Sequence, residues 1–412
     1  MTSIGYHKMK RRGSTYIMVL SSSMIVTVIG LASLLAVRVQ RRSMQMTNDT
    51  AEARLCAQSA IELGLLYVQD QNWRSTWANG TWLSDQPLGS GRFSLEGIDP
   101  RDNDLSDSED DPVLLTGTGM KGTAVHKVQI TLVPTVKPLE SLNTCLHSRD
   151  DIHIAKGDQL TVDGAPVSAN DTLDNDGTID GDAEAGRIAS QGSITGTLTV
   201  PAPSKAMPDS DIINDYINKA TWIPYTATIE NKVLTPTHNP WGWANSEGVY
   251  YIYTHNSNLT IKNSRIHGTL IVNTGAGRLT LEDAVFMQSY RSYYPVLIVE
   301  GRARIQCDGD VLSETSCDTN YNPSWAPYLG QSDDDKLDEY PNEIQGLVHV
   351  TQTLELENNT RIRGTVICHD DVHCEDQVTI THDPSLCVHP PEGYIFIEGV
   401  HVSPGSCKQV VD

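Results

Sequence analysis

The feature that constrains this chain most is an uncharged stretch of 25 residues, from Gly13 to Val37. Basic residues flank it, at positions 8, 10, 11 and 12 before it and at 38, 41 and 42 after it. As a helix rising about 1.5 Å per residue it would be about 37 Å long. That length is enough to cross a hydrocarbon core of about 30 Å. The sequence therefore predicts a transmembrane helix over residues 14–37 that contacts membrane lipid.

Charge is divided unevenly along the chain. No Asp or Glu occurs before Asp49, and seven Lys and Arg residues give the first 48 residues a charge of +7. The whole chain carries −22, so residues 49–412 carry −29. A surface this acidic repels nucleic-acid phosphates and anionic lipid headgroups. We therefore expect an acidic domain outside the membrane and no binding of nucleic acid.

Three kinds of N-terminus combine a basic segment with an apolar one. A cleaved secretory signal has an apolar core of about 7–15 residues and a small-x-small cleavage site, whereas the run here is longer and is followed by arginines. A plain signal anchor is kept as a single-pass helix. A prepilin-type anchor has a basic leader that stops at a glycine directly before the apolar helix, as Arg12-Gly13 does here.

The helix is expected to run well past the membrane, over residues 14–72. No proline occurs before Pro87, and the only glycines between positions 14 and 72 are Gly30 and Gly64. Small residues and one tyrosine then recur at helical spacing, at positions 53, 56, 57, 60, 64 and 67. We expect this stripe to pack against the chain's own first domain, and it would also let partner helices approach closely.

Lys-Met-Lys-Arg-Arg-Gly13 followed by Ser14-Thr-Tyr-Ile-Met-Val-Leu resembles the N-terminus of bacterial type IV pilin-like proteins. The segment from Glu52 to Glu62 is similar to the second half of the pilin helix. Major pilins carry Glu five residues after the peptidase cut, and this chain has Met18 there. PilX-type minor pilins and the large minor pseudopilin of type II secretion commonly lack that Glu. The resemblance is therefore to these minor members.

The resemblance implies that a prepilin peptidase cuts the Gly13–Ser14 bond and removes residues 1–13 as a basic leader. It implies a single-pass protein of the bacterial inner membrane, with a cytoplasmic N-terminus and most of the chain in the periplasm or outside the cell. It also implies partners, namely other pilin-like or pseudopilin subunits that pack on the N-terminal helix.

A small sheet is expected in residues 73–138. Alternating segments at Arg92–Ile98, Val113–Gly117 and Val125–Val133 are separated by turn residues. Three strands are about the minimum that packing against a helix stabilises, and tryptophans at positions 73, 77 and 82 are expected to fill its core. These strands resemble the sheet of the pilin-like α+β module.

A repeat defines the remaining residues, 139–412. Ser193-Ile-Thr-Gly-Thr-Leu-Thr-Val200 recurs as Arg265-Ile-His-Gly-Thr-Leu-Ile-Val272 and as Arg361-Ile-Arg-Gly-Thr-Val-Ile-Cys368. Reuse of one short-strand unit is typical of a solenoid, in which each coil needs its neighbours to bury its inner face. We expect a mainly β protein whose large domain is a right-handed parallel β-helix or β-solenoid, with insertions near residues 205–245 and 305–343. A β-sandwich is the alternative.

Four acidic residues surround Gly177 in a run that looks at first like a calcium loop: Asp174, Asp176, Asp180 and Asp182. If Gly177 were the sixth position of an EF-hand, the two end ligands would be Thr172 and Ala183, which are wrong. We therefore expect no cofactor and a solvated acidic turn. Calcium in a looser oxygen site is the alternative.

Eight cysteines, six of them after residue 300, indicate a compartment that permits disulfides. The six are Cys307, Cys317, Cys368, Cys374, Cys387 and Cys407. We expect Cys307 and Cys317 to form a local bridge and the other four to pair in a connectivity that the sequence does not determine. Zinc bound between Cys368 and Cys374, with His369 and His373, is one alternative; free thiols are the other.

These features favour a structural or assembly role, with an acidic solenoid displayed outside the membrane. The alternative is a membrane-anchored polysaccharide lyase or glycosidase, since such enzymes also use β-helices. A glycosidase needs two facing carboxylates, and no pair stands out among 52 acidic residues. Aromatic residues in segments 241–253 and 290–294 leave a surface or polysaccharide ligand open.

Overall fold

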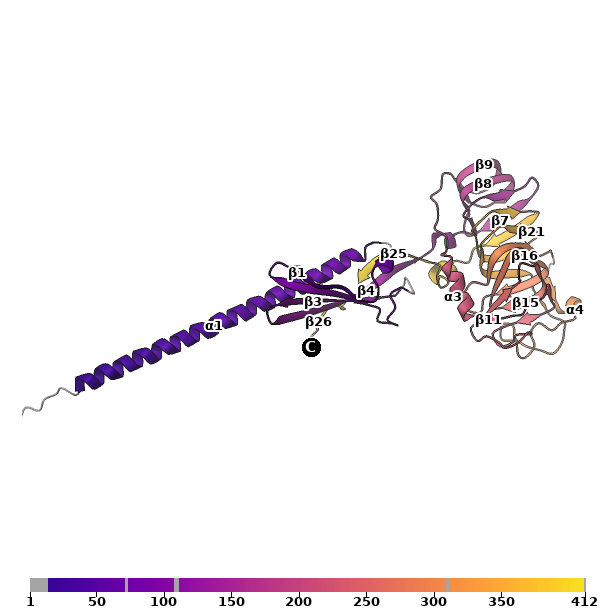
Figure 1. Ribbon diagram of the computed structural model, residues 1–412. Helices are drawn as coiled ribbons and strands as arrows, with labels where there is room; N and C mark the ends of the chain where they lie inside the picture. The colour runs from indigo at the N-terminus through magenta and orange to yellow at the C-terminus, as the bar shows by residue number, and fades with distance from the viewer. Residues whose placement is uncertain (1–13, 71–72, 107–110, 309–310, 411–412) are drawn as a thin grey trace, which may run out of the picture. The chain divides into compact units, whose positions relative to one another are not determined.

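The computed structural model describes residues 14–70, 73–106, 111–308 and 311–410 and divides the chain into two compact units (Figure 1). The small unit comprises Met1–Val136 and Ile397–Asp412, and the large unit comprises Lys137–Phe396. The expectation that residues 139–412 form a single domain is therefore wrong at its end. The last residues belong to the small unit because their strands pair with its sheet.

The first helix, α1, runs from Ser14 to Tyr67, and the short α2 (Trp73–Thr76) follows it. Serine and threonine hydroxyl groups in the apolar half of α1 form hydrogen bonds within the helix. Ser21, Thr27 and Ser33 each donate to the backbone carbonyl four residues earlier, at 2.7–2.8 Å. This pairing lowers the cost of carrying hydroxyl groups through an apolar environment. The predicted long helix is therefore present over 54 residues.

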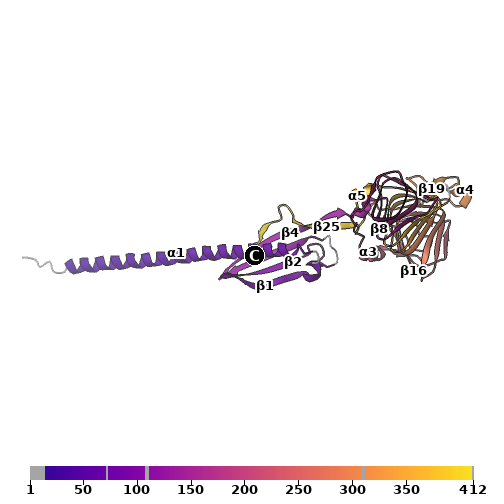
Figure 2. The same ribbon diagram turned by 90° about the horizontal axis from the view of Figure 1, so that it is seen from above.

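The sheet of the small unit is a meander extended by two strands from the end of the chain. Its strands are β1 (Gly80–Leu88), β2 (Gly91–Ile98), β3 (Val113–Lys121), β4 (Ala124–Pro138), β25 (Ile395–Val402) and β26 (Lys408–Val410). β1 to β4 pair antiparallel in sequence, and β25 and β26 both pair with β4. Trp73 and Trp82 are buried in its core, as expected. Figure 2 shows the sheet beside the C-terminal half of α1 only.

Two glycines of β3 let the sheet approach α1 closely. A Cβ atom on Gly119 would lie 1.9 Å from the carbonyl oxygen of Ala53, and one on Gly117 would lie 2.4 Å from that of Ala57. Ala53 and Ala57 are themselves fully buried. The stripe of small residues in the helix therefore packs against the chain's own sheet, because two backbones this close leave no room for side chains.

The large unit is a parallel β-solenoid, so the predicted mainly β class is confirmed. Its coils are formed by β5 (Leu146–Ser148), β6 (Ile152–Ile154), β7 (Gln159–Asp163), β8 (Val167–Asp180), β9 (Ala183–Ile194), β10 (Leu198–Thr199), β11 (Thr221–Trp222), β12 (Thr228–Glu230), β13 (Val233–Leu234), β14 (Val249–Tyr253), β15 (Leu259–His267), β16 (Thr269–Gln288), β17 (Leu297–Gln306), β20 (Glu343–Val350), β21 (Leu354–Glu357), β22 (Arg361–Cys368), β23 (Val372–Cys374) and β24 (Gln377–Thr381). All pairings between coils are parallel, and handedness stays a prediction.

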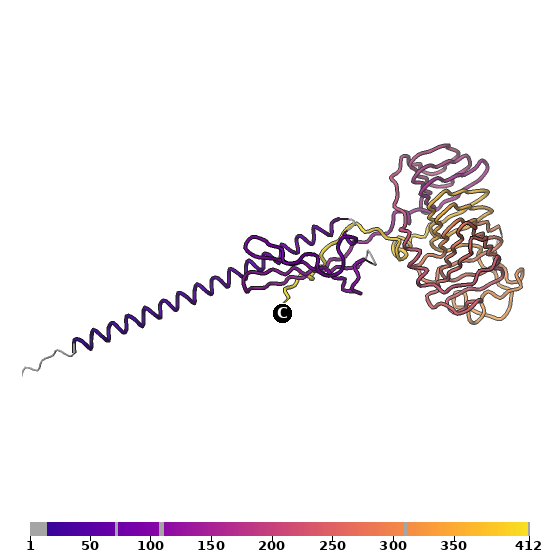
Figure 3. The backbone as a smooth tube through the Cα atoms, in the orientation of Figure 1, coloured from indigo at the N-terminus to yellow at the C-terminus, as the bar shows by residue number. Residues whose placement is uncertain are grey.

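The coils are not stacked in chain order. The first coil, β5 to β7, pairs on one side with β8 and on the other with the last coil, β22 to β24. From β8 the chain continues to β9 and β10 at one end. It then passes through α3 (Asp211–Lys219) to β11–β13 at the other end and returns coil by coil. In Figure 3 the yellow coils accordingly lie between the magenta and the orange ones.

Inward-pointing side chains form aliphatic ladders that run through successive coils. One ladder contains Leu279, Ala303, Leu354, Val372 and Ile152, each at most 1% exposed. On an outer face, α3 adds a second apolar layer, in which its Ile and Tyr side chains pack on β14 to β22. Each coil therefore depends on its neighbours for burial, which is why one unit recurs in the sequence.

The glycine of the repeated Ile-x-Gly-Thr unit lies at a corner of the coils. A Cβ atom on Gly268 would lie 2.3 Å from the carbonyl oxygen of Gly248, and one on Gly364 would lie 2.0 Å from that of Gly346. Gly196 has the same relation to an earlier glycine, at 2.4 Å. The repeat therefore marks a corner where the backbones of neighbouring coils touch and only glycine fits.

The two predicted insertions differ from each other. Region 305–343 leaves the stack as β18 (Val311–Ser313), α4 (Glu314–Cys317) and β19 (Glu339–Pro341), which pack into a separate apolar cluster. Region 205–245 contains α3, but it also contains β11 to β13, which pair with β14 and β15. The prediction of an insertion near residues 205–245 is therefore partly wrong, because residues 221–234 form the coil at the end of the stack.

Candidate functional site

The N-terminal half of α1 exposes a long apolar surface. Tyr16, Leu20, Val26 and Leu34 are between 68% and 83% exposed. An 18-residue window of α1 reaches a mean hydropathy of 2.2, and none of it is buried. By length and composition, α1 is the one helix in the described part of the chain that is able to cross a membrane.

The exposed half and the packed half belong to one uninterrupted helix. Arg38, Arg41 and Arg42 are exposed where the apolar run ends. From Ala53 to Gly64 one face of α1 is buried against β2 and β3. The apolar side chains of the first half are thus free to contact lipid or another protein. One face of the second half, in contrast, packs in the core of the small unit.

The predicted processing site lies at the boundary of the described residues. Gly13 and the basic leader 1–13 fall outside them, and α1 begins at Ser14. Cleavage of the Gly13–Ser14 bond therefore stays a prediction.

The predicted disulfides are absent, because all eight cysteines, each of them among the described residues, are free. Cys307, Cys368 and Cys374 point into the central core of the solenoid. Burial raises the pKa of each of these three thiols to about 12. They are therefore apolar core residues, and among the described residues neither Cys368 nor Cys374 joins a group of three metal-ligating side chains.

The other three predicted cysteines lie in different parts of the chain. Cys317 packs in the cluster around α4, so a bridge to the core residue Cys307 does not form. Cys387 contacts the carbonyl oxygen of Leu142 at 3.3 Å. Cys407 is exposed in the small unit. Inward positions on the coils therefore account for three of the six late cysteines, Cys307, Cys368 and Cys374, and a count of cysteines does not reveal this.

The four acidic residues considered for calcium do not converge. They are Asp174, Asp176, Asp180 and Asp182. Asp174 accepts a hydrogen bond from Ser190, Asp180 from Thr195, and Asp182 from the backbone N–H of Thr197. Among the described residues, no three of these four offer ligand atoms to one point. The run is a hydrogen-bonded ladder between β8 and the next coil.

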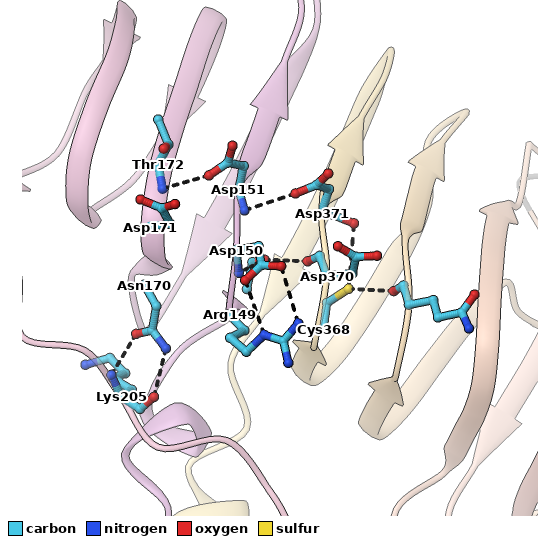
Figure 4. A network of polar contacts seen from close by, with 12 residues as sticks. Arg149, Asp150, Asp151, Asn170, Asp171, Thr172, Lys205, Cys368, Asp370 and Asp371 are labelled. Carbon is cyan, nitrogen blue, oxygen red and sulfur yellow. Dashed lines mark hydrogen bonds and ion pairs between the residues drawn. The ribbon is translucent and has the colours of Figure 1, made fainter. Parts of the chain in front are cut away.

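A different acidic corner was missed by sequence reasoning, although a repeat marks it. Ser148-Arg-Asp-Asp-Ile-His-Ile154 recurs as Cys368-His-Asp-Asp-Val-His-Cys374, and the two segments stack in register. Asp150, Asp370 and Asp371 bring ligand atoms within 4.8 Å of one another, as do Asp151, His153 and Asp371. Figure 4 shows these carboxylates at the turns after β5 and β22.

Hydrogen bonds already occupy this corner. Asp151 accepts from the backbone N–H of Thr172 at 3.0 Å, and Asp371 accepts from the backbone N–H of Asp151 at 3.3 Å. Arg149 forms an ion pair with Asp150. Asp151 and Asp371 therefore satisfy backbone donors between the first coil and its neighbours on either side.

Two histidines are fully buried between the solenoid and its outer apolar layer. His349 contacts His369 through the two Nε2 atoms at 2.9 Å and the Tyr394 hydroxyl through Nδ1 at 2.7 Å. Burial lowers its pKa to about 3. His147 makes no side-chain hydrogen bond of normal geometry, although the Ser168 backbone is close, and burial followed by the charge of Lys205 lowers its pKa to about 4. Both rings are therefore held neutral.

Two hollows bear on the enzyme alternative. One lies on the surface of α1 around Arg42, and the other lies inside the solenoid beside Trp241. The second has a volume of only about 10 Å³, and neither is lined by Asp or Glu. The facing carboxylates that glycosidase chemistry needs are not in either hollow.

Comparisons with known proteins did not identify a family for this chain. No family model matches the sequence, and no curated protein matches it. Among solved structures, an ice-binding protein from Antarctomyces psychrotrophicus is 10% identical with a TM-score of 0.31, and the match covers 60% of this chain and 98% of that one. The competence-associated pilin ComZ from Thermus thermophilus is 9% identical with a TM-score of 0.28, and the match covers 88% and 98%. Likeness at this level carries no argument about function.

Proposed function

We propose that this chain is a membrane-anchored, exported structural protein of the pilin-like kind, which displays its solenoid outside the membrane. One observation carries the proposal: the exposed apolar half of α1 continues without a break into the half that the sheet buries. The same helix is therefore both the membrane anchor and part of the core of the small unit. Because the helix is continuous, the position of its first half in the membrane fixes the position of the sheet.

Apolar residues beyond the membrane-spanning length support subunit partners. Val39, Met44 and Met46 follow the first arginine after the apolar run and are 61–68% exposed. Two of them, Val39 and Met46, lie two turns apart on one face of α1, and this face is the proposed interaction surface. Neighbouring pilin-like or pseudopilin helices would cover this surface, as minor subunits of the PilX type or of type II secretion do in the resemblance.

The orientation in the proposal places the N-terminus in the cytoplasm of a bacterial cell and the two folded units beyond the inner membrane. Basic segments next to a spanning helix are retained on the cytoplasmic side. Four basic residues precede Gly13 and three arginines follow Val37, so the charge bias toward a cytoplasmic N-terminus is one residue. The charge of −29 on residues 49–412 fits export. A prepilin peptidase would cut between Gly13 and Ser14.

Membrane fractionation of the full chain tests the anchor. Val26→Arg combined with Ile29→Arg places two charges in the exposed apolar half, and each costs about 2.5–3.5 kcal/mol at the centre of a bilayer. We expect the wild type to stay in the membrane after carbonate extraction and the double variant to be released or to fail in export.

The matched control is Leu55→Arg combined with Leu66→Arg. These two residues are 62% and 60% exposed but lie in the half that packs on the sheet. They should leave membrane association unchanged. Equal release of both variants, or a wild type that carbonate extracts, would contradict the anchor.

Cleavage is tested separately by intact mass after coexpression with a prepilin peptidase. A mass reduced by residues 1–13, and lost in Gly13→Leu, supports the pilin-like assignment. A chain that keeps Met1 while remaining in the membrane would retain the anchor and refute the processing.

A further inference from the structure

We propose that residues 185–200, called here the open end of the solenoid, form an interface at which two copies of this chain join end to end. These residues comprise most of β9 and all of β10. In Figure 3 they belong to the magenta coils at one end of the stack. The inference concerns the large unit alone and does not depend on the proposed membrane function.

The first observation is an unpaired strand edge. On its inner side β9 pairs with β8 along most of its length. On its outer side it pairs with β10 only at Ala183 and Glu184, and the carbonyl oxygen of Ala185 accepts from the backbone N–H of Ala202. Among the described residues, no strand pairs with the outer edge over residues 186–194. The N–H and C=O groups on this edge are therefore available to another strand.

The second observation is that the inner face is covered at one end of the solenoid and uncovered at the other. At the covered end, Ile229 and Leu234 are 5% and 2% exposed, and Trp241 from the following loop packs against them. At the open end, Ile188 and Ile194 also pack against the core but are only half-buried. No aromatic side chain in the described part of the chain packs over these two residues. Solenoids normally cap their end coils, because the last inner face has no further coil.

The repeated unit indicates what fits on the open end. Its copies at 265–272 and 361–368 each have coils on both sides. The copy at 193–200 lies on the coil beneath it, with Gly196 against Gly181, and no described coil follows on its outer side. Inside the chain this unit is always covered by another coil. A coil of the same kind, supplied by a second copy, continues that stacking.

The distribution of charge also favours a second copy as the partner. Residues 185–200 contain no Asp or Glu, whereas residues 167–184 contain five Asp, one Glu and no basic residue. Two chains that each carry −29 on residues 49–412 repel one another, and the repulsion is weakest where acidic side chains are missing. Arg187, the one charged residue of the open end, pairs with Asp171 of its own chain. A basic partner would instead be attracted to the acidic coils.

Two identical edges can pair around a two-fold axis. The β9 strand of one copy would run antiparallel to that of the other, and the two would exchange backbone hydrogen bonds. Ile188 and Ile194 of each copy would then cover the inner face of the other. The interface would bury the apolar side chains and satisfy the strand edges in the same contact.

The test measures the mass of the full chain in detergent by sedimentation at increasing protein concentration. We expect a monomer that converts to twice its mass. Gln191→Glu combined with Ser193→Glu adds two like charges to the open end of each copy and should weaken the dimer by about 10-fold or more. Both side chains are exposed, so this variant is expected to fold. The matched control, Thr226→Glu combined with Thr228→Glu, adds the same charge at exposed positions of the covered end and should dimerise as the wild type does.

Hydrogen exchange in the wild type locates the contact, because association through α1 would give the same mass. Peptides from residues 186–194 should exchange more slowly as the concentration rises, and peptides from residues 221–234 should not change. A chain that stays monomeric at about 0.1 mM would overturn the proposal. So would a dimer that both glutamate variants weaken equally, or one that leaves exchange in β9 unaltered. A dimer formed through α1 would refute the open-end interface and leave the membrane proposal intact.

Discussion

His153 stacks on His373, with ring centroids 4.9 Å apart and ring planes at 13°, although the residues are 220 positions apart in the sequence. The contact joins the first coil of the solenoid to its last. Ile152 lies opposite Val372 in the same pairing. Because these partners are far apart in sequence, the stack is complete only after the last coil has been added, and we expect slow, cooperative folding of the large unit.

Gly119→Ala should destabilise the small unit. The new Cβ atom would lie 1.9 Å from the backbone oxygen of Ala53, so α1 and β3 must move apart. We expect a loss of about 3 kcal/mol in the free energy of unfolding, the upper end for overpacking. Urea unfolding followed by hydrogen exchange in peptides from β2 and β3 measures it. Gly399→Ala in β25 is the control, since nothing lies within 4 Å of its Cβ position; an equal loss there would refute the contact.

The large unit should lose stability as the pH falls from about 6.5 toward 4. The unfolded chain protonates His147 below its ordinary pKa of 6.5, whereas the folded chain keeps the ring neutral until about 4. The unfolded state therefore binds more protons in this window, and the loss is on the order of 3 kcal/mol for this residue. Thermal unfolding at several pH values measures it.

Substitution of the two buried histidines should have opposite effects. His147→Phe removes a buried ring without hydrogen bonds of normal geometry, so it should raise stability at pH 5 and flatten the pH dependence. His349→Phe leaves Tyr394 and His369 without their partner, so it should cost about 1–3 kcal/mol at neutral pH. The exposed His389→Phe should change neither quantity. A pH profile that His147→Phe leaves unaltered would count against this account.

Arg265→Lys should loosen the segment around α4 and leave the solenoid intact. Arg265 is 2% exposed and donates to the carbonyl oxygens of Ala326 and Pro327, which a single ammonium group cannot replace. We expect a local loss of about 1–3 kcal/mol, seen as faster hydrogen exchange in residues 312–340 only. Arg302→Lys, an exposed arginine with one hydrogen bond to Ala276, is the control. Faster exchange across all coils would show that Arg265 supports the stack itself.

Thiol labelling checks the correction to the disulfides. In the native protein without reductant, the exposed Cys407 should react first. The buried thiols of Cys307, Cys368 and Cys374 should react only after unfolding, because burial raises their pKa to about 12. All eight should react in denaturant. Fewer than eight reactive thiols would restore a disulfide.

The sequence was sufficient to predict those parts of the structure whose stabilising contacts repeat every few residues. The uncharged run before Arg38 predicts an exposed apolar helix, and the alanine stripe after Ala53 predicts a packed face. The Ile-x-Gly-Thr unit predicts stacked coils, and the structure adds the reason, which is the contact of Gly364 with Gly346. The same reasoning failed for cysteines, since Cys307 lies in the solenoid core and Cys374 occupies a ladder position between Leu356 and Ile154.

The sequence by itself determined a membrane-length helix, an acidic part after it and a solenoid, because charge, apolar length and a repeated unit are local properties of a chain. Only the tertiary structure decided which coil lies next to which, that β25 and β26 return to the first sheet, and that Glu314 meets Asp335. Parallel coils offer nearly the same backbone edge to any neighbour, so their order depends on the fit of side chains that come from distant segments.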